Sequence, residues 1–177
     1  KAIECYTLSL QAHDDYSSSD NSDNDDDDDD NDDIYSISSA KAAAFRNMGS
    51  AYYSLGSAQM AFASYQQSIA LDPNDAVVYL RLGIFYEDLA RNDYPDAAEN
   101  AIKCFNQYLK YCDATDSNIL TKLGNLLQKE ARIEEALEVY LKAADADPML
   151  YTVWFNVAYT QRALGKYNDA IVSLEKT

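Results

Sequence analysis

The sequence has 177 residues, of which 47% are apolar and 25% are charged, and its formal net charge is −16. A charge of this sign and size repels nucleic-acid phosphates and anionic membrane surfaces, so neither is expected as a direct partner. No apolar run approaches the roughly 20 residues that a membrane-spanning helix needs, and a cytoplasmic or nuclear location is therefore expected.

The first segment, residues 1–13, contains an alanine followed four residues later by a tyrosine, Ala2 and Tyr6. The same spacing recurs further along the chain, so we interpret residues 1–13 as the second helix of a preceding partial repeat. The chain lacks an initiator Met and both of its ends fall inside the repeated pattern. We therefore expect it to be a piece of a longer protein.

Residues 14–40 form an acidic segment. Twelve aspartates and no Lys or Arg lie between Asp14 and Asp33, and such a segment repels itself and has little apolar surface to bury. This composition predicts a disordered insertion. A calcium loop that begins at Asp23 would need glycine at its sixth position, where Asp28 stands. Ser17, Ser19 and Ser22 lie just before aspartates and are candidate phosphorylation sites for acidophilic kinases, whereas the simpler interpretation is a solvating insertion.

From residue 41 onward, one arrangement of large and small residues repeats at spacings near 34, in units at 41–75, 76–115, 117–150 and, in part, 151–177. In a register that starts at 42, 76, 117 and 151, position four is large, position eight is small, and an alanine is followed four residues later by a bulky side chain. These sets are Phe45, Tyr79, Leu120 and Trp154; Gly49, Gly83, Gly124 and Ala158; and Ala61/Tyr65, Ala101/Phe105, Ala136/Tyr140 and Ala170/Leu174.

Apolar residues at these spacings make one stripe on each of two amphipathic helices per unit. The small residues allow the paired backbones to approach closely, and Pro73 and Pro148 end the second helix of two units. One unit cannot bury its apolar stripe alone, so neighbouring units must stack. The pattern predicts an all-α, right-handed superhelical solenoid of helix-turn-helix repeats.

At these residues the sequence resembles the tetratricopeptide repeat (TPR) family. The resemblance implies a protein-interaction scaffold that binds an extended peptide or a partner helix in a concave groove, which the first helices line. It places groove contacts at positions two, five, six and nine of those helices. The candidate groove residues are Asn47, Arg81, Lys122, Asn156, Arg46, Ser50, Asn125 and Tyr159.

Position six reads Asn47, Arg81, Lys122 and Asn156, all of them hydrogen-bond donors that suit peptide amides or acidic side chains. The first helices carry five cations against three acids, so the partner is expected to be acidic: Arg46, Arg81, Lys122, Lys129 and Arg162 against Glu87, Asp88 and Glu130. A carboxylate clamp of the kind that binds chaperone termini matches these residues poorly. A solvated surface without a partner is the alternative for all of them.

Two departures from the repeat predict local changes. Six extra residues near 91–96 should lengthen a turn. Tyr108 stands where a small residue is usual and Asp113 where proline is usual, so the contact between the units at 76–115 and 117–150 should be looser or reshaped.

No catalytic or metal-binding constellation accompanies these repeats, because His13 is the only histidine and Cys5, Cys104 and Cys112 lack paired spacings. We expect no enzyme activity, no metal and no cofactor in this segment, and core packing for Cys104. The function expected is that of a scaffold in a subunit of a multiprotein complex. The alternative is a non-catalytic repeat domain of a larger enzyme, such as a glycosyltransferase-like protein, that recruits protein substrates.

Overall fold

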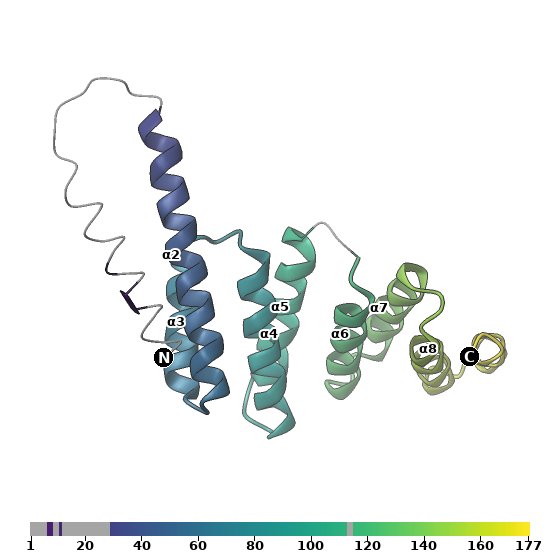
Figure 1. Ribbon diagram of the computed structural model, residues 1–177. Helices are drawn as coiled ribbons and strands as arrows, with labels where there is room; N and C mark the ends of the chain where they lie inside the picture. Colours follow the sequence, from purple (N-terminus) through teal and green to yellow (C-terminus); the bar gives the residue numbers. More distant parts are fainter. Residues whose placement is uncertain (1–6, 9–10, 12–28, 113–114) are drawn as a thin grey trace. The chain divides into compact units, whose positions relative to one another are not determined.

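The computed structural model describes residues 7–8, 11, 29–112 and 115–177. In the stretch that begins at residue 29, the side chains are described from Ser36 onward. The chain divides into two compact units, residues 1–82 and residues 83–177, which we describe one at a time. Every element in the described residues is an α-helix (Figure 1). The all-α repeat class expected from the sequence is therefore confirmed.

The first unit is built on α2 (Asp29–Ser54) and α3 (Ala58–Leu71), which lie side by side (Figure 1). Ala61 and Tyr65 of α3 are fully buried or nearly so. The buried Ser68 hydroxyl donates a hydrogen bond to the Ala42 carbonyl at 2.8 Å. The first part of α4 (Ala76–Arg91) also belongs to this unit.

Helix α2 begins earlier than the sequence analysis expected. The acidic insertion was predicted to run to residue 40, but the backbone is helical from Asp29, so the expectation of disorder is wrong for residues 29–40. An aspartate run carries no apolar periodicity from which a helix could be predicted. The rest of the insertion and most of the helix expected over residues 1–13 lie outside the described residues.

The second unit contains the end of α4 and five further helices: α5 (Ala97–Tyr111), α6 (Ser117–Lys129), α7 (Ile133–Ala146), α8 (Tyr151–Ala163) and α9 (Tyr167–Leu174). Helix α6 packs on α7, and α8 packs on both α7 and α9. Phe105, Tyr140, Val153 and Val157 are fully buried and form much of the core between these helices. Asp116 caps α6, because its carboxylate accepts from the backbone N–H groups of Asn118 and Ile119.

One contact repeats in each of the three complete helix pairs, between the glycine of the first helix and the aromatic ring of the second. A Cβ atom built on Gly49 would lie 2.6 Å from the ring of Tyr65, one on Gly83 2.6 Å from Phe105, and one on Gly124 2.5 Å from Tyr140. No side chain fits at such distances, so glycine lets each ring lie directly on the backbone of its partner helix. In the fourth pair, Ala158 stands in place of the glycine and Leu174 in place of the aromatic residue, so a larger first-helix residue faces a smaller second-helix one.

The first helix of every pair ends in the same backbone motif. Two hydrogen bonds close it, donated by two successive N–H groups, and the first of the two donor residues has a positive φ. For α2 these bonds run from Gly56 N–H to Tyr53 O (2.9 Å) and from Ser57 N–H to Tyr52 O (2.9 Å). The left-handed residues are Gly56 (φ 75°), Asp93 (φ 55°), Ala131 (φ 58°) and Gly165 (φ 73°). Alanine is an unfavourable residue for this conformation, so the turn at Ala131 is strained.

The extra residues near 91–96 do more than lengthen a turn. Helix α4 has 16 residues whereas α6 has 13, so part of the insertion extends the helix before the turn at Asp93. Lys129 contacts the C-terminal end of this longer helix: its ammonium donates to the Ala90 carbonyl at 2.5 Å and to the Asp93 carboxylate at 3.1 Å.

Within the described residues, no helix is both long and apolar enough to cross a membrane.

We predict that Ala131→Gly stabilises the protein, because glycine adopts a positive φ without strain. The gain should be about 0.5–1 kcal/mol after the larger entropy of glycine in the unfolded chain is subtracted. Urea unfolding measures it, and Gly165→Ala is the matched control, which should lower stability. Equal effects of the two substitutions would contradict this account of the turn.

We predict that Gly124→Ala destabilises the protein by about 1–3 kcal/mol, because the added methyl group overlaps the buried Tyr140 ring. The melting temperature should fall by roughly 2–4 °C for each kcal/mol lost. The same substitution in a Tyr140→Leu background should cost much less, since that pair reproduces Ala158 and Leu174. A double-mutant cycle without such coupling would show that the glycine–ring contact is not the cause.

Candidate functional site

The candidate site residues occupy positions five, six and nine of the first helices α2, α4, α6 and α8, and within each unit we call the surface that they form the first-helix face. In the first unit it comprises Arg46, Asn47 and Ser50 of α2 together with Arg81 of α4, and in the second unit Lys122, Asn125, Asn156 and Tyr159. All eight predicted groove residues lie in the described part of the chain, divided between the two units.

In the first unit, Asn47 and Arg81 are exposed, whereas Arg46 is engaged within the fold. The Arg46 guanidinium forms an ion pair with Asp75, the residue just before α4. The Ser50 hydroxyl donates to the Arg46 carbonyl at 3.2 Å and lies 3.3 Å from the Tyr65 hydroxyl. Asn47 and Arg81 are therefore the two predicted residues of this unit with polar groups directed to solvent.

In the second unit, Lys122 and Asn125 line one hollow of about 250 Å³ between α4 and α6. The Lys122 ammonium lies 2.7 Å from the Glu87 carboxylate, which also accepts from Arg91 at 2.7 Å. Other residues that line the hollow are Ala90, Leu126 and Lys129. The hollow thus has charged walls whose cations and acids are already paired.

These ion pairs alter the electrostatic argument for an acidic partner. Arg46, Lys122 and Lys129 each have an acid of the chain itself within ion-pair distance. Arg91, outside the expected set, also pairs with Asp88 at 2.6 Å. Since paired cations exert little field at a distance, Arg81 and Arg162 are the first-helix cations that remain to attract an acidic group.

Asn125 is held in one orientation by the second helix of its pair. The Tyr140 hydroxyl donates to Asn125 Oδ1 at 2.6 Å, so the amide nitrogen of this exposed side chain keeps both of its hydrogens for a partner. Burial raises the pKa of Tyr140 to about 12, and the phenol remains a hydrogen-bond donor at neutral pH. Tyr140 is therefore a positioning residue for the candidate site.

The sequence reasoning did not select Tyr140, although a signal for it was present. Where the bulky residue of the second helix is tyrosine, position nine of the first helix is polar: Ser50 opposite Tyr65, and Asn125 opposite Tyr140. Where that residue is Phe105 or Leu174, position nine is Ile84 or Tyr159. A tyrosine hydroxyl on the second helix thus occurs together with a hydrogen-bonding residue at position nine of the first helix.

Helix α8 presents aromatic side chains instead of paired charges. Phe155 is 58% exposed and Tyr159 48% exposed, and Tyr151 precedes them on the same helical stripe. The Arg162 guanidinium lies 5.0 Å from the centre of the Tyr159 ring, in cation–π contact. Asn156, which follows Phe155 directly in the sequence, is half-buried. Exposed aromatic rings next to an arginine are the residue types that most often anchor protein partners.

In the described residues, no group of three His, Cys, Asp or Glu side chains is arranged to hold a metal ion. Cys104 is buried, as expected, and burial raises the pKa of its thiol to about 12. Cys112 is half-buried. His13 and the candidate phosphorylation sites Ser17, Ser19 and Ser22 lie outside the described residues.

Paired helices with a glycine–aromatic contact and a left-handed turn in each repeat define a helical-repeat protein. The family described as TPR repeat matches residues 49–90, and tetratricopeptide repeat matches residues 117–148 and 151–176. The chain belongs to the tetratricopeptide repeat family. Membership supports a protein-interaction scaffold in general terms, since such repeats expose extended binding surfaces.

Solved structures of MamA share the fold. One has a TM-score of 0.69 at 18% identity, over 98% of this chain and 83% of that chain. A second has a TM-score of 0.66 at 16% identity, over 98% and 90%. MamA from Desulfovibrio magneticus RS-1, residue 41 to the end, has a TM-score of 0.63 at 15% identity, over 99% and 93%. No curated protein sequence matches the chain.

We predict that Cys104 makes the protein less stable at alkaline pH. The thiol pKa rises from 9.0 to about 12 on folding, so the contribution of the protonated thiol is complete below pH 9 and is lost as pH rises toward 12. Between pH 8 and 10, the free energy of unfolding should fall by about 1 kcal/mol more in the wild type than in Cys104→Ala. Urea unfolding at the two pH values measures this difference, and a Cys112→Ala variant that behaves like Cys104→Ala would contradict it.

Proposed function

We propose that this chain is a protein-binding scaffold whose first-helix face receives an extended peptide or a partner helix, within a subunit of a multiprotein complex. The observation that carries the proposal is the succession of a preset amide and exposed aromatic rings on α6 and α8. Asn125 offers two hydrogen-bond donors that Tyr140 orients, and Phe155 and Tyr159 offer apolar surface.

These groups suit a peptide main chain better than a charged small molecule. An extended segment presents a carbonyl at each residue, which an amide donor binds, and its side chains then lie over neighbouring rings. The charges of the nearby hollow are already paired, so affinity should come from hydrogen bonds and aromatic contacts more than from net charge. An acidic partner would depend chiefly on Arg81 and Arg162, and the guanidinium of Arg162 already stacks on Tyr159.

The proposal places the binding residues on the first helices and not on the second. The alternative, a substrate-recruiting domain within a larger enzyme, uses the same face. A location in the cytoplasm or nucleus and membership in a complex stay predictions of this proposal.

We predict that peptides selected from a displayed random library against the wild-type chain lose affinity when the first-helix face is altered. Phe155→Ala and Tyr159→Ala should each weaken binding by about tenfold or more, which is typical of aromatic anchors. Tyr140→Phe should weaken it less, because Asn125 is kept but is no longer held. Fluorescence anisotropy of labelled peptides measures these affinities.

The matched control is Glu138→Ala, at an exposed position on the second helix α7, which should leave affinity unchanged. Circular dichroism of each variant shows whether the fold is retained. If Phe155→Ala and Tyr159→Ala bind the selected peptides as tightly as the wild type, the first-helix face is not the binding site.

A further inference from the structure

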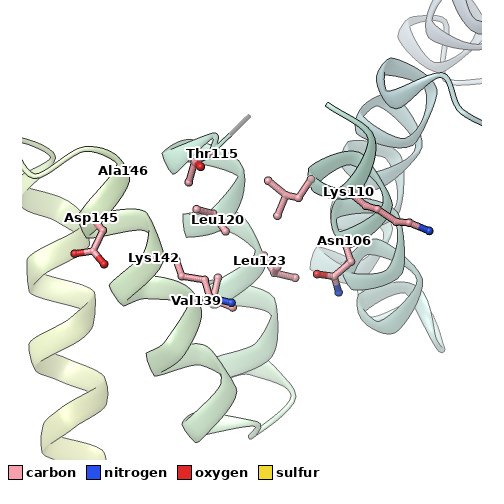
Figure 2. Close-up of a pocket in the computed structure, with 10 residues that line it drawn as sticks. Asn106, Lys110, Thr115, Leu120, Leu123, Val139, Lys142, Asp145 and Ala146 are labelled. Carbon is pink, nitrogen blue, oxygen red and sulfur yellow. The ribbon is translucent and has the colours of Figure 1, made fainter. Parts of the chain in front are cut away.

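A second hollow lies within the second unit, among α5, α6 and α7. Its volume of about 630 Å³ exceeds that of the hollow on the first-helix face. Leu120 and Leu123 of α6 line it but are themselves only 6% and 2% exposed, and Val139 of α7 lies beside them (Figure 2). It is bordered by the second helices of two successive pairs and is therefore separate from the first-helix face.

The hollow occurs at the junction where the repeat pattern is broken. At the position three residues after the packed ring, α3 has Ser68 and α7 has Ala143, and both are fully buried. Helix α5 has Tyr108 at this position, half-buried and with its hydroxyl 3.3 Å from the Asp116 carboxylate that caps α6. A phenol needs more room than a methyl or hydroxymethyl group, so the contact between α5 and the next pair is expected to differ from that of a regular repeat.

Polar groups stand at the rim of this apolar hollow. Figure 2 shows the Asn106 side chain of α5 and the Lys142 side chain of α7 on opposite sides of it. Lys110 also lines the hollow, but its ammonium lies 5.2 Å from the centre of the Tyr111 ring. Figure 2 shows that this ammonium points away from the hollow. Asp145 is the one carboxylate among the residues that line it.

The electrostatic setting of Lys142 differs from that of the first-helix lysines. Lys122 and Lys129 lie within ion-pair distance of an acid, whereas none of the ion pairs in the described residues involves Lys142. Its side chain is exposed. An unpaired ammonium beside apolar side chains favours a carboxylate from outside, and this local attraction opposes the repulsion by the net charge of −16.

We propose that this hollow is a second docking site, which takes a leucine-sized side chain of a partner segment together with an adjacent carboxylate. The apolar side chain would lie against Leu120, Leu123 and Val139. The carboxylate would bind the Lys142 ammonium, and the Asn106 amide would hydrogen-bond the main chain of the segment. The hollow, at about 630 Å³, is larger than one leucine side chain, so it also has room for the adjacent carboxylate and part of the main chain of the segment.

The test uses labelled synthetic peptides in which one central leucine is flanked by aspartates, and fluorescence anisotropy with the whole chain. Binding should be weak, with a Kd of roughly 10–500 μM, and should fall with salt. Lys142→Glu should weaken it about tenfold or more, whereas Lys166→Glu, an equal charge change at an exposed residue outside the hollow, should not. A peptide with alanine in place of leucine should lose most of the binding.

Phe155→Ala separates this proposal from the one for the first-helix face, because it should leave binding of the acidic leucine peptide unchanged. Equal losses with Lys142→Glu and Lys166→Glu would overturn the proposal, since they would show attraction to net charge alone. Absence of binding at a peptide concentration of about 1 mM would also overturn it. Circular dichroism excludes unfolding as the cause of any loss.

Discussion

The contact between a glycine and an aromatic ring determines how each pair of helices is built. Because the ring of Tyr65, Phe105 or Tyr140 comes within 2.6 Å of the place where a Cβ atom would be, the two helices are close enough to bury the ring completely or nearly so. Close approach in turn requires a tight reversal of the chain, which the left-handed turn residue after each first helix supplies. Core packing and turn geometry are thus two consequences of one spatial constraint.

The same ring also links the core to the candidate site. Tyr140 packs against Gly124 with its ring and binds Asn125 with its hydroxyl, so one side chain fills the core and orients an exposed amide. In the pair with Phe105 this link is absent and Ile84 stands at the corresponding surface position. The polarity of the first-helix face therefore depends partly on which aromatic residue the core contains.

Several features could be predicted from residue types alone, and others could not. Large and small residues at fixed spacing predicted the helix pairs, because side-chain volume acts locally, whereas the looser or reshaped junction expected from Tyr108 stays a prediction. Alanine carries no turn signal, so the positive φ of Ala131 was not predictable from its identity. The Lys129–Asp93 pair was missed for a different reason: it depends on how far α4 continues into the insertion, which spacing within one repeat does not report.

The two proposed surfaces share the α6–α7 pair but use different sides of it. Asn125 extends from α6 on the first-helix face, while Leu120 and Leu123 of the same helix contribute to the second hollow. Tyr140 supports Asn125, and its neighbour Val139 lines the hollow. Because Tyr140 is fully buried against Gly124, the pair should behave as a rigid body, and a ligand on one side has no loose element through which to disturb the other. Such an arrangement allows two partner segments to be held at once, which is what distinguishes a scaffold from a receptor for a single peptide.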